Sequence, residues 1–144
     1  LLALAMAMTC STNVVQSIDR MLNYFPPDAR QQAQIDLGAT LVGMVSMRLV
    51  PTKDGKTRRP AVEIVRGTPT VRRVIAEGAV NEIYDLVKRS SDAGMLTLNQ
   101  SLVDLVRNGD IDDATALRHS IQPDELKLNL QGMFTGTDSI RIRE

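Results

Sequence analysis

The sequence predicts a mainly α-helical α/β fragment, in which a strand, two helices and a β-hairpin precede a set of short helices. Three observations predict this fold class. Apolar residues recur at helical spacing in several short stretches, and two β-prone runs flank a polar segment that contains Asp-Gly. From Thr68-Pro69 onward, only short helical patterns follow. We expect the first part to span residues 1–67, the helical part 68–130 and a loosely held, flexible tail 131–144.

The composition is that of an ordinary globular protein. The chain has 144 residues, of which 43% are hydrophobic and 24% charged. Its 17 basic and 17 acidic residues balance, so the bulk charge predicts no nucleic-acid partner and no membrane partner. A single cysteine, Cys10, excludes an internal disulfide and suits a reducing compartment. Aromatic residues make up only 3%, which argues against base stacking on single strands.

An apolar run, Leu1 to Met8, opens the chain. It lacks the basic residues that precede the apolar region of a signal peptide, and it is far too short to span a bilayer. We therefore expect a buried strand at this place and no insertion into a membrane. We also expect the chain to begin inside a larger fold.

Two helices are expected between this strand and the hairpin. Ser11 or Thr12 should cap the first helix, and Pro26-Pro27 should end it. Asp28 should cap the second. The apolar residues expected on the buried side of the first helix are Val14, Val15, Ile18, Met21, Leu22 and Phe25. Those expected for the second helix are Ala33, Ile35, Leu37, Leu41, Val42, Met44 and Val45.

The triplet Gly55-Lys56-Thr57 raises the question of a nucleotide-binding loop. Such a loop has the pattern G-x-x-x-x-G-K-[ST] and opens a helix. Here Val50 occupies the position of the first glycine, and the stretch that follows, Ala61–Val65, has the composition of a strand. Because Met47–Val50 is also β-prone, the polar segment between the two runs predicts a β-hairpin and not a phosphate site.

Four short helices are expected after residue 67. Thr68, Thr97 and Asp112 are good N-cap residues for the first, third and fourth of them. The apolar residues expected to be buried along these helices are Val71, Val74, Ile75, Val80, Ile83, Tyr84, Val87, Leu98, Leu102, Leu105, Val106, Ala116 and Leu117. The alternating segment Leu126–Leu130 is compatible with a strand or with a short helix.

Side chains that could carry chemistry are few. His119 is expected in the last turn of a helix, in a surface or capping role. Cys10 as a nucleophile paired with His119 has no supporting motif, and a small buried residue is the simpler interpretation. The cluster Asp110, Asp112 and Asp113 fits a capping role and no calcium loop. We expect no metal site.

Charged residues on the hairpin and on the helix after Thr68 leave two readings open. The basic side chains of the hairpin either form a solvated tip or contact phosphate; they are Lys53, Lys56, Arg58 and Arg59. On the helix, Arg73 and Glu77 are four residues apart and can form an ion pair. Together with Arg72 they make the polar face more charged than so short a helix requires. This face is a candidate for a contact with another protein.

Several stretches, taken in order, resemble one family over the run from Gln16 to Leu130. They are SIDRM at 17–21, YFP at 24–26, VSMRLVP at 45–51, AVEI at 61–64, GTP at 67–69, TVRRVIAE at 70–77, GMLTLNQ at 94–100 and GDI at 109–111. These stretches resemble the C-terminal portion of the type IV pilus retraction ATPases (PilT/PilU), within the type II/IV secretion ATPase superfamily. The hairpin at 50–59 and PDELKL at 123–128 look closer to the PilU branch.

The resemblance implies the tail of a RecA-like ATPase core for residues 1–67 and a helical C-terminal domain for residues 68–130. It further implies a homo-hexameric ring in the cytoplasm, peripheral to the inner membrane. ATP and Mg would drive pilus disassembly and twitching motility. The implied partners are the inner-membrane platform of the pilus and a paralogous retraction ATPase. Nucleic acid is not among them.

The resemblance also places a family motif tied to retraction on the stretch from Thr70 to Glu77. The candidate residues of this motif are Val71, Arg72, Arg73, Ile75 and Glu77. Arg72 and Glu77 match the motif in type, while Arg73 and Ala76 depart from it. On this basis we expect Arg72→Ala to leave the fold intact and to impair retraction by the full-length motor.

Other departures concern the nucleotide site. The family's Walker A loop and Walker B box would lie upstream and are absent from these 144 residues. Cys10 holds the position of the histidine in the family's histidine box, near residues 8–13, and Met47 holds that of a glutamine. We therefore expect no catalytic or cofactor-binding residues, and no ATP hydrolysis by this chain alone. The alternative is a stand-alone helical interaction module that binds nucleic acid through the basic hairpin.

Overall fold

The computed structural model describes residues 5–9, 11–90 and 94–133. Its elements are α1 (Val14–Leu22), α2 (Arg30–Thr40), β1 (Gly43–Pro51), β2 (Arg58–Arg66), α3 (Pro69–Ala76), a short 3-10 helix η1 (Val80–Glu82), α4 (Ile83–Arg89), α5 (Leu98–Arg107), α6 (Asp113–His119) and α7 (Pro123–Leu130). The described part of the chain is thus mainly helical, as the sequence predicts, with one two-stranded antiparallel sheet. The ambiguous segment 126–130 is helical.

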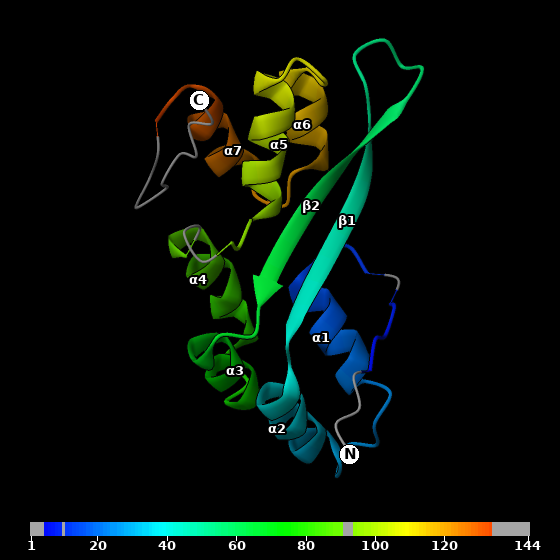
Figure 1. Cartoon of the computed structure of the whole chain (residues 1–144), viewed down its shortest axis with the longest axis vertical. Helices are drawn as coiled ribbons and strands as arrows, with labels where there is room; N and C mark the ends of the chain where they lie inside the picture. The colour runs from blue at the N-terminus through cyan, green and yellow to red at the C-terminus, as the bar shows by residue number, and fades with distance from the viewer. Residues whose placement is uncertain (1–4, 10, 91–93, 134–144) are drawn as a thin grey trace.

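The expected β-hairpin is present and is longer than the two β-prone runs. Its strands pair from Gly43 with Arg66 to Pro51 with Arg58. The first strand begins earlier than predicted. Met44 and Val45, which the sequence analysis assigned to the second helix, pair with Val65 and Ile64 of the second strand. Figure 1 shows the hairpin running along the long axis of the molecule, with helices at both of its ends.

Buried apolar side chains form two clusters. The helices that carry them lie toward opposite ends of the hairpin (Figure 1). The first cluster joins α1, α3, α4 and the end of β2; it consists of Val14, Ile18, Val65, Val71, Val74, Ile75, Ile83, Val87 and Met95. The second cluster joins α5, α6 and α7 to the part of the hairpin nearer its turn; it consists of Val50, Ala61, Leu98, Leu102, Val103, Ile111, Ala116 and Leu126. The boundary expected at residue 67 stays a prediction.

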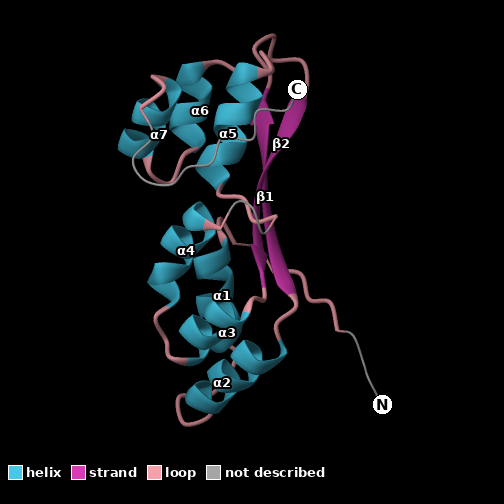
Figure 2. Ribbon diagram, turned by 60° about the vertical axis from the view of Figure 1, so that its left-hand side comes forward, coloured by secondary structure: helices cyan, strands magenta, loops and turns pink. Residues whose placement is uncertain are grey.

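The helices cover one face of the hairpin and leave the other uncovered (Figure 2). Val50, Ala61 and Val65 on the covered face are buried. On the opposite face of β1 every second residue is apolar and exposed: Val45 by 70%, Met47 by 58% and Leu49 by 51%. The outer edge of β1 pairs with no strand among the residues described, whereas β2 is bridged at its outer edge to Leu96.

Three of the predicted helix starts are confirmed. The Thr68 hydroxyl accepts the Val71 N–H at 3.3 Å, and the Asp112 carboxylate accepts the Thr115 N–H at 2.7 Å. Thr97 forms a reciprocal capping box with Gln100 at the start of α5. Each cap satisfies a backbone donor that the first helical turn leaves without a partner.

The cap predicted for α1 is wrong by one or two positions. Asn13, and neither Ser11 nor Thr12, caps this helix, because its side-chain oxygen accepts the Gln16 N–H at 2.8 Å. The hydroxyl of Ser11 instead bonds the hydroxyl of Ser17. Adjacent polar residues compete for one cap, and the backbone conformation at the cap decides among them.

The second helix differs more from its prediction. It begins after Ala29 without a side-chain cap, so Asp28 was wrongly assigned that role. The predicted buried side is also wrong in part, because Val42 and Val45 are 70% exposed and Gly38 is the buried residue of the helix. A Cβ atom at Gly38 would lie 2.7 Å from the Arg72 carbonyl oxygen on α3. The two helices therefore meet at a small residue, which a search for apolar spacing does not detect.

The apolar run at the start of the chain is not a buried strand in its described part. Residues 5–8 have no regular structure, and Met6 and Met8 are 97% and 99% exposed. A strand requires a hydrogen-bonded neighbour, and this segment has none among the described residues. Residues 1–4 and the tail from 134 to 144 lie outside the described part of the chain.

Candidate functional site

The candidate motif on α3 has a buried side and an exposed side. Val71 and Ile75 are 1% and 0% exposed and belong to the first cluster. Arg73 and Glu77 form the predicted ion pair at 3.6 Å, with side chains that are 65% and 56% exposed. A partner of α3 would therefore meet Arg73 and Glu77, while Val71 and Ile75 hold the helix in place.

Arg72 makes contacts within the chain that the sequence did not indicate. Its Nε donates to the Gly67 carbonyl at 2.8 Å, and its Nη1 donates to the Ala39 carbonyl at 3.1 Å. The side chain thus ties the end of α2 to the connection between β2 and α3. Because these bonds are lost in Arg72→Ala, we expect this substitution to lower the stability of the chain, so an effect on retraction would not by itself identify a partner contact. Hydrogen bonds from a charged group stabilise by roughly 1.5–3 kcal/mol in favourable settings.

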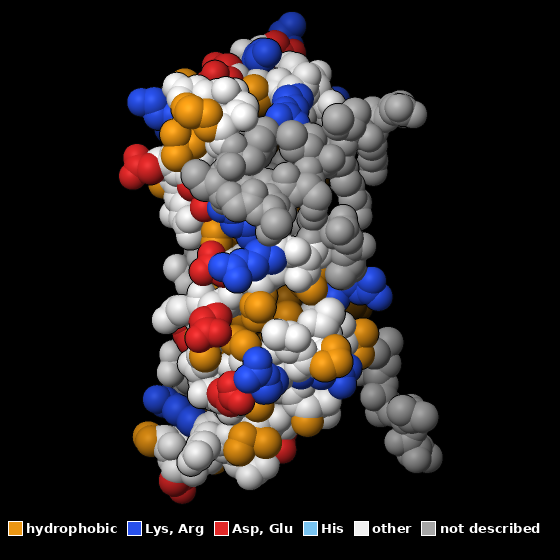
Figure 3. Space-filling model, turned by 90° about the vertical axis from the view of Figure 1, so that its left-hand side faces the viewer, with side chains coloured by type: hydrophobic (Ala, Val, Ile, Leu, Met, Phe, Trp, Pro, Cys, Tyr) orange, Lys and Arg blue, Asp and Glu red, His pale blue; other side chains and the backbone are white. Residues whose placement is uncertain are grey.

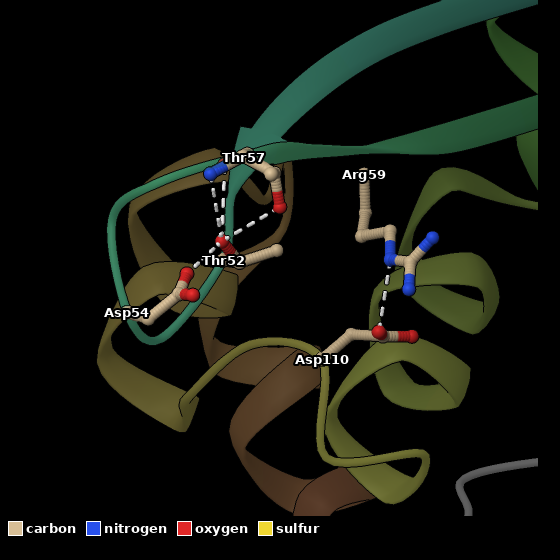
Figure 4. A network of polar contacts seen from close by, with 5 residues as sticks. All are labelled: Thr52, Asp54, Thr57, Arg59 and Asp110. Carbon is tan, nitrogen blue, oxygen red and sulfur yellow. Dashed lines mark hydrogen bonds and ion pairs between the residues drawn. The ribbon is translucent and has the colours of Figure 1, made fainter.

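The Gly-Lys-Thr triplet lies in the turn between β1 and β2, and Figure 4 shows the polar contacts of Thr52, Asp54 and Thr57 in this turn. The Thr52 hydroxyl bonds the Asp54 carboxylate at 2.6 Å and accepts the Thr57 N–H at 3.3 Å. The Asp54 carboxylate also accepts the Lys56 N–H at 3.1 Å. The Thr52 hydroxyl, followed by the Lys56 amide, lowers the pKa of Asp54 below its usual value. The turn uses its own amides and places a carboxylate where a phosphate would bind, so it does not fit a nucleotide.

The base of the turn is attached to the loop before α6. Arg59 Nε and Asp110 Oδ1 form an ion pair at 2.9 Å (Figure 4). The Lys53 N–H donates to the Asp110 carbonyl at 3.1 Å. Thus Asp110 holds the hairpin turn, while Asp112 caps α6 as predicted.

Glu63 is a buried charged residue that the sequence analysis did not single out. It lies on the covered face of β2 and is 4% exposed. Its Oε2 accepts the Val14 N–H at 2.9 Å, at the start of α1. Burial raises the pKa of Glu63 above its usual value, and the Val14 N–H and the charge of Arg48 oppose this shift.

Arg48 lies beside Glu63 on the covered face of β1 and bonds two distant segments. Its Nε and Nη2 donate to the Thr12 carbonyl at 3.1 and 2.9 Å. Its Nη1 donates to the His119 carbonyl at 2.8 Å. The segment before α1 and the last residue of α6 are therefore held by one guanidinium group. His119 itself ends α6, where the sequence places it.

The strand period was the signal that could have found Glu63. In the run Ala61-Val62-Glu63-Ile64-Val65, alternation puts Glu63 on the same face as two apolar residues, Ala61 and Val65. A carboxylate on a buried face requires a partner. The partner is 49 residues away in the chain, so the sequence could not identify it.

No group of three or more metal-ligating side chains lies close enough together to hold an ion in the described ranges. Cys10, which the resemblance aligns with a histidine, lies outside the described residues. None of the described helices is long and apolar enough to cross a bilayer.

Comparison with known proteins supplies curated relatives of this chain. It is 36% identical over 128 residues to the type IV pilus ATPase PilU of Pseudomonas aeruginosa, a match that covers 89% of this chain and 34% of that protein. It is 31% identical to a twitching motility protein of Neisseria gonorrhoeae, over 76% of this chain and 29% of that protein. It is 32% identical to the retraction ATPase PilT of P. aeruginosa, over 69% and 28%. The chain thus spans about a third of the length of the curated relatives it matches.

Solved structures agree with the sequence matches. A crystal structure of the pilus retraction motor PilT with bound ADP aligns with a TM-score of 0.68 and 31% identity, covering 79% of this chain and 31% of that one. The ATPase DotB of Yersinia pseudotuberculosis shares the fold, with a TM-score of 0.63 at 24% identity. No protein-family model matches the chain. By its sequence and its fold, this chain belongs to the type IV pilus retraction ATPase family and corresponds to a C-terminal portion of its members.

Proposed function

We propose that this chain is the C-terminal part of a hexameric pilus retraction motor, in which it serves ring assembly and force transmission. The observation that carries the proposal is the 36% identity to PilU over 89% of the chain. The PilT structure with a TM-score of 0.68 supports it at the level of the fold. Residues 1–67 would be the tail of a RecA-like core and residues 68–130 the helical C-terminal domain.

The uncovered face of the hairpin indicates that a further part of the protein packs against it. Val45, Met47 and Leu49 expose more than half of their side chains along one strand, and the outer edge of that strand pairs with no described strand. A contiguous apolar surface beside an open strand edge marks a site of further packing. The occupant we assign to it is the remainder of the ATPase core, because the relatives are about three times as long as the matched region.

ATP and Mg would bind outside the residues described here. The turn that contains Gly55-Lys56-Thr57 does not fit a nucleotide, so no step of hydrolysis is assigned to this chain. The proposed role of α3 is contact with a retraction partner through Arg73 and Glu77, the exposed residues of its motif. The candidate partners are the inner-membrane platform and a paralogous retraction ATPase, and the place is the cytoplasmic side of the inner membrane.

A nucleic-acid-binding module has less support. Of the four basic residues on the hairpin, Arg59 is paired with Asp110 at 2.9 Å. On the face drawn in Figure 3, Lys and Arg side chains lie among Asp and Glu side chains and do not gather into one patch. Phosphate binding by a surface generally requires a cluster of positive charge.

The test isolates the native polypeptide from its source cell with an antibody against this chain. We expect an intact mass above 15.8 kDa by at least one domain of roughly 100–150 residues, a six-subunit particle and ATP hydrolysis. Loss of the gene should abolish retraction. In the native protein, Arg73→Ala should keep the ring and hydrolysis but reduce retraction, while Arg89→Ala, on exposed α4 surface, should not.

Two results would contradict the proposal. A native polypeptide of 15.8 kDa would rule out a motor subunit built on this chain. Binding to DNA with a steep salt dependence, without ring formation, would favour the interaction module instead.

A further inference from the structure

The covered face of the hairpin is polar at its middle. Val65 belongs to the first cluster, and Val50 and Ala61 belong to the second. Between them lie Arg48 and Glu63, on the same face of the two strands. Apolar packing is therefore interrupted at this point, and charged side chains connect the two clusters.

The two charged residues hold the segment that leads into α1. Glu63 accepts the Val14 N–H, one of the amides that a helix start leaves free. Two nitrogens of Arg48 hold the Thr12 carbonyl, two residues earlier. The third bond of Arg48, from Nη1 to the His119 carbonyl at 2.8 Å, reaches the end of α6 on the side of the second cluster.

The shape of the guanidinium group matters to this contact. Its donors lie in one plane and at fixed angles, so bonds from Nε and Nη2 to Thr12 and from Nη1 to His119 fix the direction between the two carbonyls. A lysine at position 48 would carry the same charge on a single flexible nitrogen. It would not impose a direction on both acceptors at once.

We propose that Arg48 is a positioning residue that couples the segment Thr12–Val14 to the C-terminal end of α6. A displacement of the Thr12 carbonyl moves the guanidinium group and so weakens or redirects its bond to the His119 carbonyl. Loosening at the start of α1 should therefore destabilise the last turn of α6. The coupling is a property of this chain and does not depend on the proposed motor. If the motor function is correct, the coupling would pass movement of the stretch that aligns with the histidine box to the helices α5–α7; this consequence rests on the proposed function.

A second polar contact between the same groups of helices provides a control. Glu125 on α7 accepts the Tyr84 hydroxyl at 2.8 Å and pairs with Lys88 at 3.3 Å, both on α4. This contact also joins the two ends of the molecule but does not touch Thr12 or Val14. If the coupling runs through Arg48, it should persist when the contacts of Glu125 with Tyr84 and Lys88 are removed. If it runs through all contacts between the two groups of helices, it should weaken.

The test measures hydrogen exchange of single backbone amides by NMR in the whole 144-residue chain. Asn13→Ala removes the cap of α1 and so loosens the segment at Thr12. With Arg48 present, we expect faster exchange in α1 and also in the last turn of α6, by roughly five-fold or more. In Arg48→Met the same Asn13→Ala substitution should leave α6 unchanged.

Matched variants separate this link from general loosening. Coupling should be retained in Glu125→Gln and in Arg59→Met, which removes an arginine elsewhere on the hairpin. It should be largely lost in Arg48→Lys, since the charge remains but the planar donors do not. Equal coupling in Arg48→Lys, or coupling in Arg48→Met as strong as in the native chain, would overturn the proposal.

Reciprocity provides a measurement that requires no change at Arg48, should Arg48→Met fail to fold. Asp112→Ala removes the cap of α6 and should speed exchange at the start of α1, because coupling between two sites acts in both directions. If Asn13→Ala leaves α6 unchanged and Asp112→Ala leaves α1 unchanged in the native sequence, the two segments are independent and the proposal is wrong.

Discussion

Glu63 lies in surroundings that disfavour its charge. It is 4% exposed on a face shared with apolar residues, and one backbone N–H, that of Val14, bonds its carboxylate. Burial raises its pKa above the ordinary value of 4.5. The folded protein therefore keeps the proton of Glu63 to a higher pH than the unfolded chain does.

This shift predicts a pH dependence with a definite sign. The stability contributed by Glu63 is fully present below about pH 4.5 and is lost as pH rises through the folded pKa. Glu63→Gln retains a side-chain oxygen for the Val14 N–H but cannot ionise. We expect the free energy of unfolding of the native chain to fall relative to that of Glu63→Gln as pH rises from about 4.5. Urea denaturation of both proteins at several pH values measures the difference.

Asp112 provides a control of opposite sign. Bonds from the Thr115 hydroxyl and amide lower its pKa, so its contribution is present above the unfolded pKa and is lost as pH falls. Asp112→Asn should therefore destabilise the protein more at neutral pH than in acid. For each variant, the free energy of unfolding of the native chain minus that of the variant is plotted against pH. A plot for Glu63→Gln that is flat, or that slopes in the same direction as the plot for Asp112→Asn, would contradict the raised pKa of Glu63.

Local contacts explain which residues the sequence could predict. Thr68, Thr97 and Asp112 were recognised as caps because each bonds an amide three residues away. Arg48 and Glu63 were not recognised, because their partners lie 36 to 71 residues away and become neighbours only in the folded chain. The same reason explains why Arg72 was assigned to a partner when its guanidinium bonds the chain itself.

The contact between α2 and α3 depends on the absence of a side chain. A Cβ atom at Gly38 would lie 2.7 Å from the Arg72 carbonyl and 3.0 Å from the Ala76 backbone nitrogen. Both atoms belong to the backbone of α3, which cannot move aside as the end of a side chain can. The spacing of these two helices is therefore set by a glycine.

Gly38→Ala tests this spacing. In an exposed helix the change would stabilise by up to about 1 kcal/mol, but here it forces the helices apart, and overpacking costs roughly 1–3 kcal/mol. We expect a net loss of stability, measured as a lower midpoint of urea unfolding. Gln31→Ala, at an exposed position of the same helix, should have little effect. A variant Gly38→Ala as stable as the native chain would show that the contact is loose.

Among the helices and strands, the sequence predicted those that have a capping residue and regular apolar spacing better than those that lack them. The helices α3, α5 and α6 have caps and apolar spacing, and all three begin where expected. The second helix has no side-chain cap and buries a glycine, so neither its start nor its buried side followed from the pattern. The apolar run from Leu1 to Met8 predicted a strand from its character alone, although pairing depends on a neighbour, and its described residues 5–8 have no regular structure.

Over the whole molecule, the uncovered face of the hairpin has the most direct consequence for function. Apolar residues occur on both faces of β1, and the sequence pattern alone does not say which face this chain covers. The pattern is typical of a strand buried on both sides. The structure covers one side, and the proposed remainder of the ATPase core would cover the other.

The combined substitutions Val45→Thr, Met47→Gln and Leu49→Thr test this surface. In the 144-residue chain the three side chains are 70%, 58% and 51% exposed, so each change should alter stability by no more than about 0.5 kcal/mol. In the proposed full-length protein the same changes should lower the thermal midpoint by several degrees, because the remainder of the core would bury this surface. Differential scanning calorimetry of the two proteins makes the comparison.

Tyr24→Ser provides the control, since this side chain is 74% exposed but lies in the loop after α1, away from the hairpin. It should have little effect in either protein. If the combined substitutions affect both proteins equally, the surface has no neighbour in the full-length protein, and the assigned occupant is wrong.

The hairpin is attached at both of its ends to the helical parts of the chain, and its length therefore sets the distance between the two apolar clusters. At one end Val65 on β2 belongs to the same apolar cluster as Val71 and Ile75 on α3. At the other end Asp110, in the loop between α5 and α6, holds Lys53 and Arg59. Nine paired residues per strand lie between these points, each advancing the strand by about 3.4 Å. Two extra residues in each strand would displace one apolar cluster from the other by roughly 7 Å. Extra residues within the turn between β1 and β2 would leave that distance unchanged. We therefore expect changes in length to be tolerated in the turn and not within the paired strands.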